Sequence, residues 1–291
     1  MPELPEVETF RQGLERLTLD REIQGGEVLR DRPPAGWSDR TIAHPSSIPE
    51  FLGALQGCRI RAWQRRGKYL LARLQRQERP AGWLGVHLRM SGQFFWVTPT
   101  EPLPKHTRVR LWLAPDRELR FVDQRTFGKL WWVPPDTAIE TIITGLATMG
   151  PEPLSPEFST DYLYRTLHRR QRPMKTALLD QTIIAGLGNI YADEALFLSG
   201  IHPQQRCCDV PDDRWQALKD AIVRVLQEGL QAGGTSFSTY TSLEGVNGNY
   251  GGIAWVYQRT GQPCRQCGTA IARIKLSGRS SHFCPQCQPL I

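Results

Sequence analysis

Four cysteines near the end of the sequence constrain the fold more than any other feature. Cys264 and Cys267 form one C-x-x-C pair, and Cys284 and Cys287 form a second pair after sixteen intervening residues. Two such pairs, each on its own loop, can close a tetrahedral zinc site made of thiolates alone. Four protein ligands leave no position for a catalytic water, so the predicted zinc is structural. Disulfide pairing is the alternative, and the lack of a recognisable secretory segment disfavours it.

The segment that contains these cysteines carries positive charge only. Residues 259–291 have no Asp or Glu, and their cations are Arg259, Arg265, Arg273, Lys275 and Arg279. A small metal-stabilised hairpin with one sign of charge favours contact with a phosphate backbone. An ordinary solvent-exposed face is the alternative, although such faces normally mix both signs.

The composition is that of a folded protein with room for more than one domain. The chain has 291 residues, is 40% hydrophobic and carries a net charge of +7,. No apolar run approaches the ~20 residues needed to cross a membrane, and no signal peptide is visible. With free cysteines and a zinc site, these features predict a protein of the reducing cytoplasm that does not associate with membranes.

Residues 1–134 are predicted to form an N-terminal domain of short strands and one helix. Apolar residues at spacings of three and four predict the helix from Pro5 to Leu17,. Strand-like runs separated by Pro, Gly and Asp follow it, at 59–63, 69–74, 83–88, 93–97, 108–113, 119–122 and 129–133. The pattern predicts an antiparallel β-sandwich packed with a helix, within an α+β multidomain protein.

Residues 135–252 are predicted to form a helical domain. Candidate helices cover 136–149, 161–170 with a cap at Ser155, 174–180, 189–199 and 212–232,. Gly186 and Gly188 allow a tight double turn, and Asn189 suits the N-cap of the helix that follows. Helix, double turn and helix form a shape that can hold DNA phosphates on backbone amides, while a purely structural helical hairpin is the alternative.

A glycine-rich polar loop, from Gly233 to Gly252, joins the helices to the predicted zinc-finger domain at 253–291. Roughly twenty residues of such chain inside a compact protein form either a functional lid or a disordered segment. The sequence alone favours neither.

The first residues offer a candidate nucleophile. Removal of Met1 would leave Pro2 with a secondary amine, and α-amino groups titrate near pH ~8. Such an amine can attack an electrophilic carbon and form an iminium, with Glu3 beside it as a proton donor. The alternative is that Pro2 to Pro5 only open a helix, for which proline and acidic residues are suited.

Taken together, these motifs resemble the formamidopyrimidine-DNA glycosylase family of bacterial base-excision repair enzymes. The resemblance covers the whole chain in order and rests on the start at Pro2 to Glu8, on 65–70, 87–92, 123–128 and 186–192, and on the four-cysteine finger. It implies an N-terminal catalytic β-sandwich domain, a helix-two-turn-helix domain and a zinc finger.

The resemblance also implies catalytic roles. Pro2 would be the nucleophile at the sugar C1′, and Glu3 the general acid/base that protonates the sugar as the glycosidic bond breaks. Glu6 resembles a supporting carboxylate. Lys68 would contact a phosphate beside the lesion and assist elimination, and Arg279 would donate a proton at that stage.

Further residues would bind DNA. Three of them would fill the gap left by an everted base: Met90, Arg125 and Phe127. Asn189 and Arg279 would grip phosphates, and Lys175 aligns with a family lysine near the DNA. The loop from Thr235 to Tyr250 corresponds to one that closes on a flipped 8-oxoguanine. For Met90 and Phe127, burial in the core is the alternative.

The implied activity is that of a bifunctional DNA glycosylase and abasic-site lyase. It would remove 8-oxoguanine and formamidopyrimidines from damaged double-stranded DNA through a Schiff base, then cleave the strand by β- and δ-elimination. The enzyme would bind one structural zinc ion and act as a monomer in the bacterial cytoplasm, associated with the nucleoid.

Two departures from the family pattern bear on the loops. Gln124 stands where the family commonly has proline, and Ser238 where some relatives carry arginine. The related endonuclease VIII-type glycosylases, which prefer oxidised pyrimidines, are one alternative, and Leu4 argues against it because their opening usually has glycine there. A non-catalytic zinc-containing DNA-binding protein is another, and it would need neither Pro2 nor Glu3.

Overall fold

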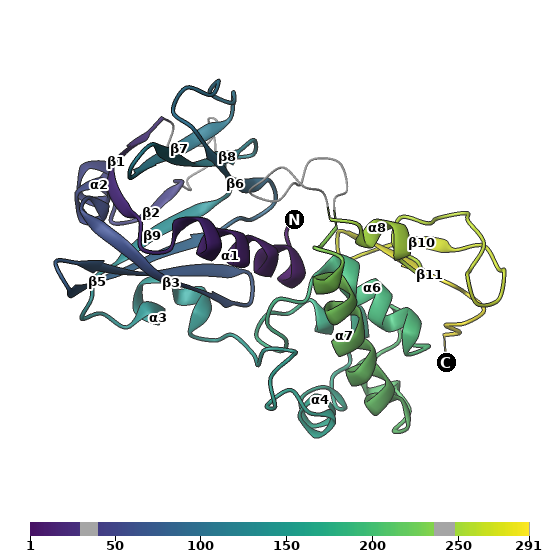
Figure 1. Ribbon diagram of the computed structural model, residues 1–291. Helices are drawn as coiled ribbons and strands as arrows, with labels where there is room; N and C mark the ends of the chain where they lie inside the picture. The colour runs from purple at the N-terminus through teal and green to yellow at the C-terminus, as the bar shows by residue number, and fades with distance from the viewer. Residues whose placement is uncertain (30–39, 236–247, 291) are drawn as a thin grey trace. The chain divides into compact units, whose positions relative to one another are not determined.

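The protein is described by a computed structural model, which covers residues 1–29, 40–235 and 248–290 (Figure 1). Contacts divide these residues into two compact units. The N-terminal unit contains residues 1–2, 6–148 and 248, and the C-terminal unit contains residues 3–5, 149–235 and 249–290.

The N-terminal unit is built on one nine-stranded sheet with the order β2-β9-β5-β4-β3-β1-β7-β8-β6. Every pairing is antiparallel except that of β2 with β9. The strands are β1 (Glu22–Val28), β2 (Ile42–His44), β3 (Cys58–Arg66), β4 (Tyr69–Arg76), β5 (Arg79–His87), β6 (Gly92–Val97), β7 (Thr107–Leu113), β8 (Arg117–Asp123) and β9 (Lys129–Val133).

Strand β1 joins the two halves of this sheet, because it pairs with β3 on one side and with β7 on the other. Buried residues of both halves, such as Leu70 and Phe121, belong to one apolar cluster. The halves therefore face each other as the layers of a sandwich, with β7, β8 and β6 in one layer and β5 and β3 in the other (Figure 1). The predicted β-sandwich is confirmed, with the added feature of a continuous sheet.

Helix α1 (Leu4–Thr18) matches its predicted range closely. Its residues Val7, Phe10 and Leu14 are fully buried in the core of the N-terminal unit, as the spacing of the apolar positions requires,. Helix α2 (Ile48–Leu55) was not predicted. Ser47 caps it by accepting a hydrogen bond from the backbone N–H of Glu50,.

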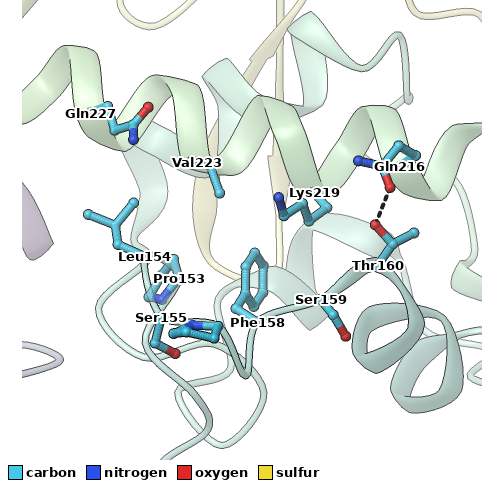
Figure 2. A pocket seen from close by; sticks show the side chains of 11 residues that line it. Pro153, Leu154, Ser155, Phe158, Ser159, Thr160, Gln216, Lys219, Val223 and Gln227 are labelled. Atoms are coloured by element: carbon cyan, nitrogen blue, oxygen red, sulfur yellow. Dashed lines mark hydrogen bonds between the residues drawn. The ribbon is translucent and has the colours of Figure 1, made fainter.

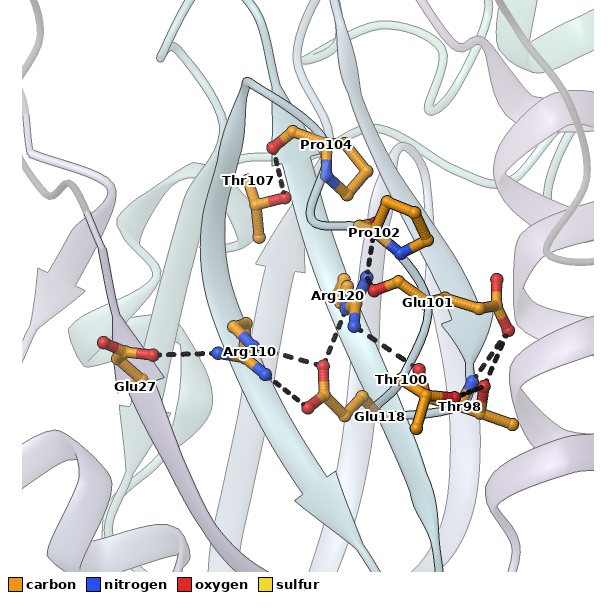
Figure 3. Close-up of polar contacts among 10 residues, drawn as sticks. All are labelled: Glu27, Thr98, Thr100, Glu101, Pro102, Pro104, Thr107, Arg110, Glu118 and Arg120. Atoms are coloured by element: carbon orange, nitrogen blue, oxygen red, sulfur yellow. Dashed lines mark hydrogen bonds and ion pairs between the residues drawn. The ribbon is translucent and has the colours of Figure 1, made fainter.

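A buried charge network lies on β7 and β8 (Figure 3). Glu118 accepts hydrogen bonds from Arg110 and from Arg120, whose nearest approaches are 2.6 and 2.7 Å. Arg120 also donates to the carbonyls of Glu101 and Pro102 in the β6–β7 loop, both at 3.0 Å. The network thus fastens that loop to the sheet.

The single helix predicted over 136–149 is wrong in extent. The structure has only the short α3 (Ile139–Ile142), followed by a 3-10 turn at Thr144–Leu146. Gly145 sits in that turn because a Cβ there would come within 2.2 Å of the Tyr69 hydroxyl. Because glycine is a poor helix former, its presence at 145 interrupts the predicted helix.

The C-terminal unit contains α4 (Thr160–Leu167), α5 (Met174–Leu178), α6 (Asn189–Leu198), α7 (Arg214–Gln231) and α8 (Tyr250–Ile253). The prediction of Ser155 as a helix cap is wrong. Pro156 follows it, and Ser159 caps α4 instead by accepting the N–H of Tyr162 at 3.0 Å,. The other predicted helices lie within a few residues of the observed ones.

A hollow of about 480 Å³ lies beside α7 in this unit, and Pro153, Phe158 and Lys219 are among the residues lining it (Figure 2). None of the predicted site residues lines it.

Strands β10 (Ala272–Leu276) and β11 (Arg279–Phe283) form an antiparallel hairpin near the end of the chain. Its apolar support is a small cluster of Phe197, Val256, Cys264, Ile271 and Cys284. Among the described residues, no helix is both long and apolar enough to span a membrane.

Candidate functional site

The carboxylate of Glu3 lies at the N-terminus of α6. Its oxygens accept hydrogen bonds from the backbone N–H groups of Ile190, at 3.0 Å, and Tyr191, at 3.4 Å. The first N–H groups of a helix lack partners within it, and the positive end of the helix dipole attracts an anion. Glu3 is only 2% exposed. The N-terminus of α6 therefore fixes the carboxylate of the third residue of the chain through two backbone N–H groups.

The double turn before α6 is shaped to receive these first residues. Gly186 has a φ of +80° and its carbonyl accepts the N–H of Leu4 at 3.1 Å. At Gly188 a Cβ would come within 2.2 Å of the Glu3 carboxyl carbon. Both glycines are thus required by close packing of the chain start, which is a tertiary reason beyond the turn itself.

Asn189 does not act as the predicted N-cap. Gly188 occupies the cap position without a side-chain hydrogen bond, and Glu3 supplies the capping oxygens from elsewhere in the chain. The Oδ1 atom of Asn189 is buried and accepts no hydrogen bond from the described residues.

Two adjacent carboxylates on α6 hold the end of the chain in place, and sequence reasoning missed both. Glu194 accepts three backbone N–H groups, those of residues 255, 256 and 257, at 2.7 to 2.9 Å. Burial raises the pKa of Glu194, and these amides oppose the rise. Asp193 accepts both the backbone N–H and the ring Nδ1 of His282, on β11. Paired acids inside a buried apolar helix were the available signal.

Lys175 is a buried member of the same network. Its ammonium group lies 2.6 Å from Asp193 Oδ1 and donates to the Ser280 carbonyl at 2.7 Å. Burial lowers the pKa of Lys175, and Asp193 opposes that shift. At 1% exposure, Lys175 links α5, α6 and β11. Arg279, the residue before Ser280, is exposed and has no ion pair with a described side chain.

The predicted catalytic residues of the N-terminal unit are all buried. Lys68 is 5% exposed and follows Gly67, whose φ of +54° permits the two-residue turn between β3 and β4. Glu6 is 2% exposed in the first turn of α1. Pro2 is buried and carries Met1 on its nitrogen, so it is an amide there and becomes an amine only when Met1 is removed.

The three predicted gap-filling residues lie on two turns of the N-terminal unit. Met90 is 46% exposed between β5 and β6, which excludes the alternative that it is a core residue. Arg125 is exposed and Phe127 partly exposed between β8 and β9. The Arg125 guanidinium lies 4.8 Å from the centre of the Phe127 ring, a cation–π distance,.

His87 supports the first of these turns. Its Nδ1 accepts the N–H of Arg89 at 3.0 Å, and Arg89 has a φ of +55°. Burial, aided by Arg89 and Lys68, lowers the pKa of His87 to about 3. The ring is therefore neutral at physiological pH and remains a hydrogen-bond acceptor.

The four predicted cysteines come together as one cluster, with all their sulfur atoms within 4.8 Å of one another. Cys264 and Cys287 are 3.9 Å apart, and Cys267 and Cys284 are 3.4 Å apart. Zn–S bonds of about 2.3 Å at tetrahedral angles place sulfurs about 3.8 Å apart, so the cluster fits a zinc ion.

The predicted flipped-base loop lies largely outside the described residues, since the structure describes only Thr235 and residues 248–250 of it. The same holds for Ser238.

Three family models match the chain in succession. The formamidopyrimidine-DNA glycosylase N-terminal domain matches residues 1–130, the H2TH domain of the same glycosylase residues 149–241, and the zinc finger found in FPG and IleRS residues 261–290. The chain belongs to the formamidopyrimidine-DNA glycosylase family. It is accordingly a DNA glycosylase with a finger that binds one structural zinc ion.

Relatives match over the full length of the chain. A formamidopyrimidine-DNA glycosylase from Nostoc sp. is 57% identical, covering 99% of this chain and 100% of its own. The Synechococcus sp. relative is 59% identical, with 99% of each chain covered. The family assignment therefore extends to every domain.

Solved structures agree with the fold. A Lactococcus lactis FPG variant in complex with Fapy-dG-containing DNA has a TM-score of 0.88 at 33% identity, covering 99% of this chain and 100% of that one. A MutM structure with DNA containing carbocyclic 8-oxo-G has a TM-score of 0.87 at 33% identity, with the same coverage.

Proposed function

We propose that this glycosylase removes oxidised purines, namely 8-oxoguanine and formamidopyrimidines, from duplex DNA and then cleaves the strand at the abasic site. The observation that carries the proposal is the Glu3 carboxylate, held by two amides at the N-terminus of α6 directly after Pro2. The solved relatives bound to Fapy-dG and carbocyclic 8-oxo-G support the choice of substrate.

The chemistry starts from the terminal amine. Once Met1 is removed, Glu3 takes a proton from the Pro2 ammonium and frees its lone pair. The Pro2 nitrogen then attacks the sugar C1′ as the C1′–base bond breaks, and the departing base anion takes up the proton that the new C1′–N adduct loses. Glu3 gives its own proton to the ring oxygen as the C1′–O4′ bond breaks and the iminium forms. The iminium acidifies the C2′ hydrogen, so β-elimination expels the 3′ phosphate and δ-elimination the 5′ phosphate. Glu6 is a supporting carboxylate near Pro2 and Glu3 in the sequence.

DNA is bound by cations and held open by inserted side chains. Lys68 contacts a phosphate beside the lesion, while Asn189 and Arg279 grip others, and Arg279 donates a proton at elimination. Asn189 offers its side-chain N–H₂ to phosphate, because an amide group carries donors as well as an acceptor. Lys175 contributes to DNA binding indirectly. Its buried ammonium group donates to the Ser280 carbonyl and so positions β11, which carries Arg279. Met90, Arg125 and Phe127 fill the gap in the base stack.

Zinc has a structural role in this proposal. Its four thiolate ligands shape the hairpin that carries Arg279, and no step of the reaction passes through the metal. The enzyme acts as a monomer, in the bacterial cytoplasm and associated with the nucleoid.

Borohydride trapping tests the central step. Protein with Met1 removed should be reduced onto 8-oxoguanine duplex DNA through Pro2, while an N-terminal tag should abolish trapping. The same tag at the C-terminus is the control and should leave trapping intact. Glu3→Gln should lose base excision by far more than it loses DNA binding. Efficient trapping of the N-terminally tagged protein would contradict the assignment of Pro2.

Substrate choice is tested by comparing single-turnover excision from 8-oxoguanine and thymine-glycol duplexes. A clear preference for thymine glycol would favour the endonuclease VIII-type activity instead. The comparison is worthwhile because a Lactococcus lactis FPG has been solved in complex with DNA that contains an oxidised pyrimidine.

A further inference from the structure

The two turns that carry the gap-filling residues start at the same end of paired strands. In the β6–β8 ladder, Gly92 is the partner of Asp123. Met90 lies in the turn that leads into β6, and Arg125 and Phe127 lie in the turn that leaves β8. Adjacent turns on a sheet can be joined by side chains, and here they are.

The joint is the carboxylate of Asp123, which is fully buried. Ser91 donates its hydroxyl to Oδ1 of this carboxylate. The backbone N–H of Arg125 lies 3.0 Å from Ser91 Oγ and 3.2 Å from Asp123 Oδ1, and the N–H of Gly128 lies 2.7 Å from Oδ2. One carboxylate thus holds the residue after Met90 together with the backbone on both sides of Phe127.

Both turns contain a residue in the left-handed region that side chains disfavour. Arg89, before Met90, has a φ of +55°, and Thr126, between Arg125 and Phe127, has a φ of +58°,. Such backbone persists where the surroundings determine it, and the bonds to His87, Ser91 and Asp123 do so here,.

We infer that Asp123 and Ser91 are positioning residues that make the two turns one rigid element, so that Met90, Arg125 and Phe127 enter the base stack together. This rests on the proposed gap-filling function of those three side chains. A side chain that must offset the cost of unstacking does so best when no backbone has to be ordered at the moment of insertion.

Ser91→Ala in the full-length, zinc-loaded enzyme isolates the link, because it removes one hydroxyl and leaves the Asp123 carboxylate with its two backbone donors. We expect single-turnover excision of 8-oxoguanine from duplex DNA to fall roughly tenfold, the equivalent of one hydrogen bond of about 1.4 kcal/mol. Cleavage at a pre-formed abasic site should fall less than about threefold, since no base is extruded there. Ser91→Thr retains the hydroxyl and should restore excision.

Thr98→Ala is the matched control. Thr98 is also in a turn of the N-terminal unit and donates its hydroxyl to a carboxylate, that of Glu101, at 3.2 Å. This change should leave both rates unaltered. If Ser91→Ala instead slows both substrates equally and lowers the melting temperature, the hydroxyl only stabilises the fold and the inference is wrong.

A double-mutant cycle tests whether the turns act as one element. Phe127→Ala and Ser91→Ala alter different turns, so independent turns would give rate losses that multiply. We expect Ser91→Ala to cost less than about threefold in the Phe127→Ala background. Multiplicative losses would overturn the coupling while leaving the gap-filling role intact. If Phe127→Ala and Met90→Ala themselves leave duplex excision unchanged, the gap-filling function fails and the inference falls with it.

Discussion

Each unit of the molecule uses a buried ion pair to hold an outer segment. In the N-terminal unit, Arg120 and Glu118 approach to 2.7 Å and are each 1% exposed. In the C-terminal unit, Lys175 and Asp193 approach to 2.6 Å at 1% and 0% exposure. Arg120 fixes the β6–β7 loop through backbone carbonyls, and the Lys175 pair fixes β11 through Ser280 and His282.

The two pairs differ in what else supports the segment they hold. The sheet of the N-terminal unit encloses an extensive apolar core drawn from α1, α2 and most of its strands. The zinc hairpin has an apolar cluster of only five buried residues, and two of these are zinc ligands. Apolar burial dominates the stability of ordinary domains, whereas small modules depend on metals or other staples. The buried ion pair therefore contributes a minor share of the stability of the N-terminal unit and a major share of the stability of the zinc hairpin.

The largest expected effect is that of zinc removal, which should destabilise one unit and spare the other. Cys284→Ser, or chelation, should release the metal and unfold the hairpin, because structural zinc supplies about 10–16 kcal/mol in small finger peptides. DNA affinity should collapse while the β-sandwich stays folded. Zinc content, hydrogen exchange and DNA binding measured on one sample would check this. Protection lost equally in both units would show that the sandwich also depends on the metal.

The next effect is the loss of one partner from the buried pair of the C-terminal unit. Asp193→Asn leaves the Lys175 ammonium buried without its counter-charge, which typically costs about 3–5 kcal/mol. We expect faster zinc release and weaker DNA binding, with little change in the unfolding of the sandwich. Adding Lys175→Met should recover much of the loss, since it removes the unpaired charge.

Glu118→Gln is the matched change in the N-terminal unit. It should lower the stability of the sandwich, although Arg120 keeps its backbone carbonyl partners. Zinc release should be unaltered, because Glu118 and the zinc ligands belong to different units. Equal effects of the two substitutions on zinc release would contradict the comparison.

A smaller effect is expected for a single exposed cation of the hairpin. Arg279→Ala should retain zinc, weaken binding to an uncleavable abasic-site duplex and reduce the slope of log affinity against log salt by about one. Lys275→Ala, on the other strand of the hairpin, is the control for charge alone. An unchanged salt slope for Arg279→Ala would argue against its contact with phosphate.

Local patterns predicted much of this architecture. The spacing of the cysteines and the apolar stripe of α1 each depend on residues close in sequence, and the structure confirms both. Strands β1 and β2 were missed. The first contains Gly25 and Gly26, which disfavour a strand locally and are required because Trp112 and the Arg110 carbonyl lie against them,.

The polar contacts of the site could not be predicted in the same way. Glu3 accepts amides 187 and 188 residues away, and Asp193 meets His282 after a separation of 89 residues. Such pairings are set by tertiary packing, for which a single sequence holds no periodic signal. The resemblance to a family supplied roles for individual residues, while the carboxylates that position them came only from the structure.

The smallest expected effect is on the pH dependence of the stability of the N-terminal unit. The group responsible is His87, which is buried as a neutral hydrogen-bond acceptor and belongs to no ion pair among the described residues. Its pKa is lowered to about 3 in the folded protein, whereas an exposed histidine titrates near 6.5,. The unfolded chain therefore binds a proton below pH ~6.5 that the folded chain does not bind until about pH 3. The contribution of His87 to the free energy of unfolding is fully present above pH ~6.5. As the pH is lowered below that value, the contribution decreases by up to about 1.4 kcal/mol per pH unit. His87→Asn keeps an acceptor for the Arg89 N–H but cannot titrate. Urea unfolding of the sandwich at pH 7 and 5.5 should show a loss about 1 kcal/mol smaller for His87→Asn than for the wild-type enzyme. An identical pH dependence in the two proteins would mean that His87 is not the group that senses protons in this unit.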